Sequence, residues 1–411
     1  MSERLPREQL RALQLERLRA TVGRLLASPS PLAGRLRDAG VGAAEDISSL
    51  DDLARLPFTE KADLREHYPF GLLAVPRERL ARVHASSGTG GKPTVVGYTH
   101  GDLDVWAEVM ARCMATAGVR PGMLVHNANG YGLFTGGLGF HHGAERLGAT
   151  LLPVSTGQTR RQLTLLRDLQ AQVLCSTPSY AMTIAEALEA ESGGPEALSL
   201  ELGLFGAEPW SEAMREQLER RLGLRARNFY GLSEIIGPGV AVECEAADGL
   251  HLNEDHFLVE ALDGELVITT LTKEALPLIR YRTADVATVT EEPCACGRTL
   301  ARMSPVQGRR DDMLILRGVN LYPSEIEHVL LGVEGVEPHY ELTVERPGAS
   351  DEVRVRCEAS GDRAGVAERV HAALRERTGL AIEVELVAPG TLPRSEGKAA
   401  RVIDRRVSPS S

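Results

Sequence analysis

The sequence predicts an α/β protein with a large N-terminal α/β domain, an attached β subdomain and a small α+β C-terminal domain. Strand-like and helix-like segments alternate from residue 123 to residue 231, the order of a mostly parallel sheet covered by helices. Helical periodicity then stops between residues 238 and 306, where strand patterns remain. A shorter α+β pattern, of ordinary domain size, follows a charged boundary at residues 308–318.

The first elements follow from local patterns. Residues 7–27 place leucines and a valine at helical spacing between charges, which predicts an amphipathic helix. Residues 79–86 and 93–99 are typical of strands, and the loop ASSGTGGKP lies between them. We expect Thr99 to cap the next helix, with Asp102 in its first turn and Gly118 at its end.

The remaining elements alternate along the chain. Strands are expected at residues 123–128, 150–154, 172–178, 200–206 and 225–231, and helices at 139–148, 159–170, 180–191 and 211–223. Antiparallel strands are expected at 257–262, 264–271 and 285–292. The small domain should hold a helix after Pro323 with a Ser324/Glu327 capping box, strands at 339–345, 352–359 and 382–387, and a helix at 363–377. We place residues 1–310 in the first domain and 311–411 in the second.

Composition limits the classes of function. The net charge of −11 over 411 residues argues against general nucleic-acid binding, although one local cationic loop can still bind a nucleotide. An uncharged apolar run of membrane-spanning length is missing, the first ten residues do not resemble a signal peptide, and six cysteines are scattered. We therefore expect a reduced, cytoplasmic protein without a membrane partner. Only four of the 46 basic residues are lysines: Lys61, Lys92, Lys273 and Lys398.

The loop at residues 85–93 is typical of a phosphate-binding loop. Its backbone N–H groups, hydroxyls and Lys92 ammonium can fold over a polyphosphate. It is not a Walker loop, because Ser86 stands where the first glycine should be and Pro93 follows the lysine. A dinucleotide fingerprint fails because the third spaced glycine is missing. An ordinary glycine hairpin remains the structural alternative.

Several motifs in one order give the chain a family resemblance. They are HASSGTGGKPTVVGYT, GYGLFTGGLG, TPSYA, GAEPW, YGLSEIIGPGVA, IRYRTADV, GRRDDMLILRGVNLYPSEIE and LPRSEGKAARV. Together they resemble the adenylate-forming acyl-CoA ligases, and within them phenylacetate–CoA ligase and its relatives, over nearly the whole chain. The resemblance implies the adenylate-forming fold and a two-step reaction. The acid and ATP give an acyl adenylate and pyrophosphate, and CoA then takes the acyl group as a thioester.

The resemblance also implies roles for the matching residues. Lys398 would stabilise charge between the carboxylate and the α-phosphate, and Lys92 would act with the loop donors on the leaving pyrophosphate. Glu234 would offer an oxygen ligand to Mg²⁺, Tyr230 a flat face to adenine, Asp285 and Arg309 contacts to the ribose, and Asp311 the hinge. The predicted ATP/AMP-binding residues are Ser86, Ser87, Gly88, Thr89, Gly90, Gly91, Gly206, Ala207, Glu208, Pro209, Tyr230, Gly231, Asp285 and Arg309. In isolation, Tyr230 could be a core aromatic, Glu234 a helix-start carboxylate and Asp285 a turn cap.

An aromatic acid fits the predicted acyl pocket best. Glycines beside two aromatic rings permit flat packing against an aryl group, and no cation in these segments would meet a second carboxylate. We expect phenylacetate or a substituted benzoate. The pocket residues would be Tyr131, Phe134, Gly136, Ile235, Ile236, Gly237 and Pro238. Asn127 and Asn129 could bond ring substituents, or they could be solvent-facing turn residues.

Four further residues have the chemistry of a structural zinc site. Cys244-x₆-His251 and Cys294-x-Cys296 flank predicted strands, so two hairpin ends could bring thiolates and an imidazole together. The family resemblance also implies a structural zinc ion at this place. We predict one zinc ion per chain; four unrelated residues are the alternative.

One residue of the phosphate-binding loop departs from the family pattern. Gly90 stands where the family loop usually has a second threonine, so one hydroxyl donor is lost and the backbone gains freedom. Three alternatives to CoA ligation remain open: transfer of the acyl group to a carrier-protein thiol, transfer to an amine, and a non-catalytic nucleotide-binding regulator. A homodimer is expected only from the resemblance.

Overall fold

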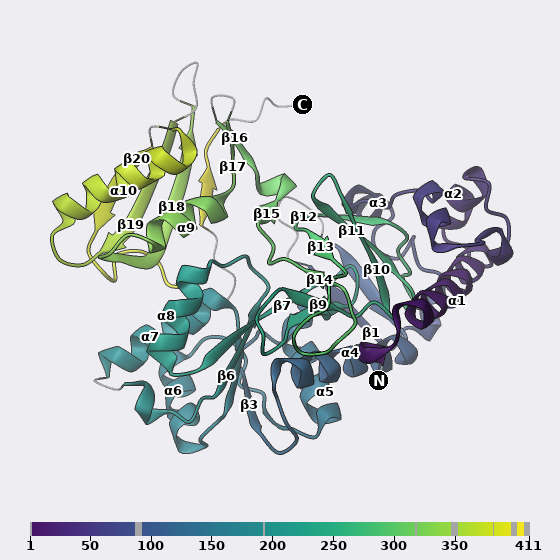
Figure 1. Cartoon of the computed structure of the whole chain (residues 1–411), viewed down its shortest axis with the longest axis horizontal. Helices are drawn as coiled ribbons and strands as arrows, with labels where there is room; N and C mark the ends of the chain where they lie inside the picture. The colour runs from purple at the N-terminus through teal and green to yellow at the C-terminus, as the bar shows by residue number, and fades with distance from the viewer. Residues whose placement is uncertain are drawn as a thin grey trace.

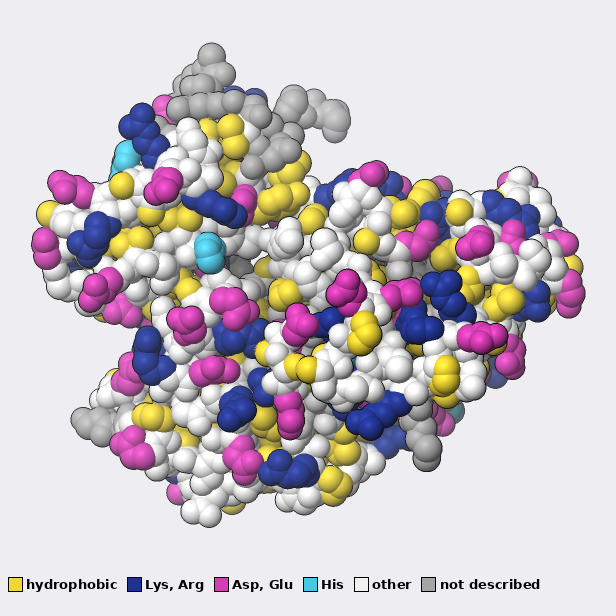
Figure 2. Space-filling model, in the orientation of Figure 1, with side chains coloured by type: hydrophobic (Ala, Val, Ile, Leu, Met, Phe, Trp, Pro, Cys, Tyr) yellow, Lys and Arg dark blue, Asp and Glu magenta, His cyan; other side chains and the backbone are white. Residues whose placement is uncertain are grey.

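The computed structural model describes residues 2–86, 93–191, 194–316, 319–346, 352–380, 382–395 and 401–406. A large body built on a nine-stranded sheet carries a smaller α+β body, which lies beside α7 (Pro178–Ala190) and α8 (Glu212–Leu222) in Figure 1. Within the described residues, no helix is long and apolar enough to cross a membrane. Figure 2 shows basic and acidic side chains interspersed over this face of the molecule.

The nine-stranded sheet confirms the predicted α/β class. Its order is β13-β14-β9-β8-β7-β6-β5-β3-β4. The last five strands in that order are parallel, since helices connect them, whereas β8, β9, β14 and β13 add antiparallel pairs. The strands are β3 (Leu124–Asn127), β4 (Thr150–Leu152), β5 (Val173–Ser176), β6 (Leu202–Gly206), β7 (Arg225–Leu232), β8 (Gly237–Glu243), β9 (Leu250–Leu252), β13 (Val289–Thr290) and β14 (Arg302–Met303).

The helices of the large body begin and end where polar caps and glycines predict. Thr99 caps α4 (His100–Ala117) in a capping box with Asp102, and Gly118 ends it with a left-handed backbone. Thr177 caps α7, with Pro178 at its first position. The remaining crossover helices are α5 (Thr135–Leu147), α6 (Thr159–Asp168) and α8.

The N-terminal segment and a second sheet complete the large body. The predicted helix at residues 7–27 is α1 (Arg7–Leu26), followed by α2 (Leu32–Asp38) and α3 (Lys61–Glu66). The hairpin β1 (Arg82–Ala85) and β2 (Val95–Tyr98) flanks the glycine loop, as expected. Short 3₁₀ turns lie at Ser2–Arg4, Ala44–Asp46, Leu50–Arg55, Arg77–Arg79, Pro195–Ala197 and Arg310–Asp312.

The expected single strand at residues 285–292 is wrong. It divides into the end of β12 (Tyr281–Val286) and β13, which belong to different sheets. Val286 pairs with Gly308 in one sheet and Val289 with Met303 in the other, so the chain changes sheets between them. The second sheet has four strands: β10 (Phe257–Leu262), β11 (Glu265–Thr270), β12 and β15 (Gly308–Arg309).

The small body has its own hydrophobic core, contributed by residues 314–382. It contains a hairpin, two helices and a four-stranded sheet ordered β20-β19-β18-β21. The elements are β16 (Leu314–Leu316), β17 (Val319–Leu321), α9 (Pro323–Leu331), β18 (Val336–Glu345), β19 (Glu352–Ala359), α10 (Arg363–Thr378), β20 (Glu383–Val387) and β21 (Val402–Asp404).

The expected Ser324/Glu327 capping box is wrong. Pro323 occupies the first helical position of α9, so the cap falls on Tyr322 and the third position on Glu325. The Tyr322 backbone N–H donates to the Glu325 carboxylate at 3.2 Å. Ser324 instead donates to the Gln307 carbonyl, and Glu327 is buried and accepts from the Ser211 N–H of the large body at 3.3 Å.

Candidate active site

A cavity of about 310 Å³ opens at the carboxyl ends of β6 and β7. Ligands in doubly wound sheets bind at this edge, because the connections there leave a crevice. The cavity is lined by many of the residues that the sequence indicates: Ser86, Ala207, Glu208, Pro209, Tyr230, Gly231, Glu234, Asp285, Arg309 and Asp311. Five distant segments of the chain therefore meet at one site.

Tyr230, Asp285 and Arg309 form one hydrogen-bonded group in this cavity. The Tyr230 hydroxyl donates to Asp285 Oδ2 at 2.7 Å, and Arg309 Nη1 donates to Asp285 Oδ1 at 2.9 Å. Strand register places the second pair, since Asp285 in β12 is the direct partner of Arg309 in β15. Burial, with Asp285 alongside, raises the pKa of Tyr230 well above its usual value, so the hydroxyl keeps its proton. The group holds an oriented carboxylate against the cavity.

Arg309 also joins this carboxylate to the turn Arg310–Asp312, which precedes the small body. Its Nε and Nη2 atoms donate to the two oxygens of Asp311, each at 2.9 Å. Although burial alone would lower it, Asp311 and Asp285 raise the pKa of Arg309. One guanidinium thus contacts the carboxylate assigned to the ribose and the aspartate assigned to the hinge.

The segment Gly206–Pro209 passes tightly along one wall. A Cβ atom on Gly206 would lie 2.2 Å from the Phe229 carbonyl oxygen of the neighbouring strand, so only glycine fits. Ala207 has a left-handed backbone, with φ of 72°. Glu208 accepts from the Ser179 N–H at 2.7 Å, at the start of α7. This wall is connected directly to that helix.

Glu234 is buried, and a lysine without a role in the sequence analysis lies near it. Lys273 donates to the Ile235 carbonyl at 3.0 Å and stands 4.1 Å from the centre of the Tyr98 ring. Burial lowers the pKa of Lys273 to about 8, although the charges of Asp102 and Glu234 oppose the shift. Lys61, Asn228 and Asp312 also line the 310 Å³ cavity, and the sequence motifs gave them no role there. The scarcity of lysine was the signal that could have indicated Lys61 and Lys273.

The predicted acyl-pocket residues lie on two segments, 131–136 and 235–238, and differ in burial. Ile235 and Ile236 are buried, and Pro238 accepts from the Trp106 indole N–H at 2.9 Å. Gly136 and Tyr131 are half-buried, whereas Phe134, which caps α5, is 52% exposed. Gly237 has a φ of 103°. None of these seven residues is among those that line the 310 Å³ cavity.

The reading of Asn127 and Asn129 as solvent-facing turn residues is wrong, because both are buried. Asn127 lies at the end of β3 and donates through Nδ2 to the Tyr131 hydroxyl at 2.9 Å and to the Gly137 carbonyl at 2.8 Å. Its amide therefore ties the end of β3 to Tyr131 and to the first turn of α5. Asn129 in turn donates to Asn127.

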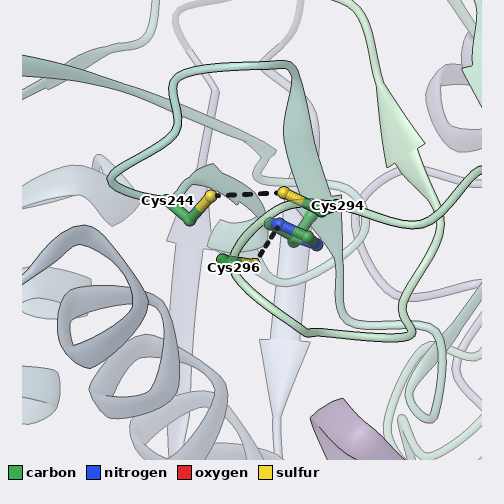
Figure 3. Close-up of side chains that lie close together, drawn as sticks. Cys244, Cys294 and Cys296 are labelled. Carbon is green, nitrogen blue, oxygen red and sulfur yellow. Dashed lines mark hydrogen bonds between the residues drawn. The ribbon is translucent and has the colours of Figure 1, made fainter.

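The four residues with zinc-ligand chemistry lie together. Their donor atoms are all within 4.8 Å of one another. Figure 3 shows Cys244 and Cys294 pointing toward each other, with Cys296 beside the imidazole. The sulfur atoms of Cys244 and Cys294 are 3.7 Å apart, and Cys296 Sγ is 3.3 Å from His251 Nε2.

These separations fit a tetrahedral zinc site. With Zn–S bonds of about 2.3 Å and Zn–N bonds of about 2.0 Å, tetrahedral angles require S···S and S···N separations of about 3.8 and 3.5 Å. Cys244 follows β8, His251 lies on β9, and the two other cysteines lie in the connection from β13 to β14. A metal here would hold together the antiparallel edge of the main sheet.

Several predicted residues lie outside the described part of the chain. They are Ser87, Gly88, Thr89, Gly90, Gly91, Lys92 and Lys398. A backbone hydrogen bond joins the described residues on the two sides of the 87–92 segment: the Ser86 N–H donates to the Thr94 carbonyl at 2.9 Å. Lys398 belongs to the segment 396–400, and the described residues on its two sides are Ser395 and Arg401.

Comparisons with known proteins agree in sequence and in structure. The family model described as "AMP-binding enzyme" matches residues 22–256, and the "AMP-binding enzyme C-terminal domain" matches residues 318–406. The phenylacetate-coenzyme A ligase of Thermus thermophilus is 52% identical over 438 aligned positions, covering 98% of each chain.

Solved structures of one ligase give two different scores. A 2-hydroxyisobutyryl-CoA ligase in the postadenylation state, in complex with 2-HIB-AMP, is 30% identical and superposes with a TM-score of 0.91 over 98% of this chain and 91% of that one. The same ligase with 2-HIB-AMP and CoA, in the thioesterification state, scores 0.72. The present arrangement therefore matches the postadenylation state. Family models, sequence identity and the shared fold together show that the chain belongs to the AMP-binding enzymes, among the phenylacetate–coenzyme A ligases.

Proposed function

We propose that this chain is an ATP-dependent ligase that joins an aromatic carboxylic acid to CoA through an acyl adenylate. The observation that carries the proposal is the grouping of Tyr230, Asp285, Arg309 and Glu234 around one cavity, in a chain related over almost its full length to phenylacetate–coenzyme A ligases. Carboxylate attack on ATP needs an oriented nucleotide, a metal ligand and cations at the phosphates.

Each residue has a proposed part in the reaction. The Tyr230 ring packs against adenine, and Asp285 and Arg309 bind the ribose hydroxyls. Glu234 would hold Mg²⁺, which supplies charge stabilisation on the phosphates. Ser86 and the glycine loop through Lys92 bind the leaving pyrophosphate, and Lys398 stabilises the reacting α-phosphate. Residues 1–310 form the adenylation domain and residues 311–411 a mobile domain that rotates about Asp311 between the two steps.

The proposed substrate is phenylacetate or a substituted benzoate. The loop with Tyr131, Phe134 and Gly136 would close one side of the acyl group, and the segment Ile235–Pro238 the other. Buried Asn127 supports this, because it orients the Tyr131 hydroxyl. Transfer to a carrier-protein thiol remains the second candidate, since carrier protein and CoA both present a pantetheine arm. A homodimer, a cytoplasmic location and a structural zinc ion complete the proposal.

Acid-dependent exchange of pyrophosphate into ATP tests the first step without assuming the acceptor. We expect exchange with phenylacetate or a benzoate-type acid, and none with straight-chain acids of similar size. CoA and a pantetheinylated carrier protein, supplied in parallel to the loaded enzyme, then identify the acceptor. Failure of every acid in an aryl and alkyl panel to support exchange would contradict ligase function.

A further inference from the structure

Helix α7 carries a polar stripe that faces the small domain. Ser179, Thr183 and Glu186 are spaced by four and three residues, so they lie on one face of the helix. Ser179, at one end of the stripe, lines a cleft of about 260 Å³ between the two bodies. None of the three has a role in nucleotide or acyl binding above.

Each residue of the stripe contacts the small domain. Arg401 Nη2 donates to Ser179 Oγ at 3.0 Å, and Thr183 Oγ1 donates to the Ser395 carbonyl at 3.5 Å. Arg394 Nε donates to Glu186 Oε2 at 2.8 Å. Ser395 and Arg401 are the described residues on either side of the segment 396–400, which contains Lys398. Both flanks of the lysine segment are therefore held on one helix.

Glu186 is the charged residue of this stripe, and it has two partners in the small domain. It accepts from Arg394 through one oxygen and lies 2.5 Å from His339 Nε2 through the other. Its side chain is only 22% exposed, so water screens these contacts weakly. Burial alone would raise the pKa of Glu186, but His339 and Arg394 hold it below the usual range. The charged form is thus the one present at neutral pH.

Arg394 is presented to Glu186 by its own domain. Its Nη1 and Nη2 atoms each donate at 2.8 Å to the fully buried carboxylate of Glu358, and its Nε remains for Glu186. Glu358 also accepts from the Gly390 and Leu392 N–H groups, at 2.9 and 2.7 Å. When the small domain moves, the Arg394–Glu358 contact moves with it, and of these Arg394 contacts only the one with Glu186 has to break.

We propose that Glu186 is a positioning residue for adenylation: it docks Arg394 and His339 on α7 and so holds the small domain in the arrangement needed for the first step. This rests on the proposed function, in which Lys398 acts in adenylation and the small domain then rotates. The arrangement shared with the postadenylation-state ligase is the one that contains the contact. In this proposal, thioester formation uses the rotated arrangement of the small domain and does not need the Glu186 contact.

The Glu186→Ala variant separates the two steps. Loss of hydrogen bonds to a charged group should lower acid-dependent pyrophosphate exchange roughly ten- to a hundredfold. Thioester formation from synthetic acyl adenylate and CoA should stay within about twofold of the wild type, because that step does not use this arrangement. Glu186→Gln keeps the size and an acceptor, so its loss should be intermediate. Arg394 is left intact because its removal would leave the buried Glu358 charge unpaired.

Glu189→Ala is the matched control. Glu189 lies three residues along α7 but pairs with Arg221 of the large domain, at 2.6 and 2.7 Å. It should leave both steps unchanged. An equal loss in the two steps, an undiminished exchange rate, or the same selective loss in Glu189→Ala would overturn the proposal.

Small-angle scattering of the full chain tests the contact without catalysis. Glu186→Ala should shift the protein toward other domain arrangements and change its radius of gyration, whereas Glu189→Ala should scatter like the wild type. Identical scattering of all three proteins would overturn the proposed contact. A wild-type chain that exchanges no pyrophosphate would contradict the ligase function. The scattering experiment would still test the Glu186 contact, so failure of the proposed function and failure of the proposed contact are distinguishable.

Discussion

Replacement of Cys294 by alanine should remove a zinc ion and loosen the edge of the main sheet. Cys294 Sγ lies 3.7 Å from Cys244 Sγ, and the four candidate donor atoms lie within 4.8 Å of one another. With three ligands left, the site loses its closed tetrahedral set, and zinc affinity falls. The wild-type protein, purified without chelators or a metal-affinity tag, should contain one zinc ion per chain.

The size of the effect follows from linkage. A metal present at a thousandfold excess over its dissociation constant stabilises the folded state by about 4.1 kcal/mol. An unfolding entropy of about 2.1 cal/mol/K per residue gives roughly 0.9 kcal/mol/K for a chain of this length. Loss of the metal should therefore lower the unfolding temperature by about 5 °C.

Elemental analysis and thermal unfolding, each with and without chelator, measure this effect. Cys175→Ala is the matched control, because Cys175 is another buried thiol of the large body and lies on β5, away from the cluster. Chelator should destabilise the wild type and Cys175→Ala but leave Cys294→Ala unchanged. A wild-type protein that is free of zinc and indifferent to chelator would refute the reasoning.

Three other perturbations test the site. Lys398→Ala should suppress adenylate formation far more than thioester formation from preformed adenylate; equal losses in the two assays would contradict its role. Tyr230→Phe removes the 2.7 Å hydrogen bond to the Asp285 carboxylate and should lower kcat/KM for ATP in pyrophosphate exchange roughly ten- to a hundredfold; an unchanged value would show that the hydroxyl does not orient the nucleotide site. Lys273→Met tests burial of charge. The pKa of Lys273 falls from 10.5 to about 8 on folding, so between these pH values the unfolded chain binds a proton that the folded chain does not. Wild-type stability relative to the variant should then rise with pH by roughly 3 kcal/mol over this window; parallel unfolding curves in denaturant would refute this.

Local patterns predicted most of the fold. The Thr99 cap, the Gly118 end of α4 and the alternating segments of the large sheet lie where the sequence places them, because caps, glycine turns and hydrophobic periods act over a few residues. The wrongly predicted strand, in contrast, depends on longer-range contacts. The strand expected at residues 285–292 divides because its two ends pair with different partners, Gly308 and Met303.

The candidate site was predicted residue by residue but not as a geometry. The motifs indicated Tyr230, Asp285 and Arg309 separately, whereas the single hydrogen-bonded group depends on the pairing of β12 with β15. Lys61 and Lys273 were named only as rare lysines, since their positions near the cavity and Glu234 arise from packing. The interdomain contact of Glu186 had no local signal, because α7 meets Arg394 about 200 residues later in the chain.

Patterns in the sequence were enough to predict the class of the fold, the order of its elements and the residue types that bind a nucleotide and a metal ion. The packing of the whole chain brings these residues into contact at the distances that their chemistry needs. Cys244 and Cys294, far apart in sequence, come within 3.7 Å because two sheet connections converge. Glu186 gained its partners because the small body lies against α7. The preference of a segment for helix, strand or turn depends on neighbouring residues, whereas contacts between domains depend on the packing of the whole chain.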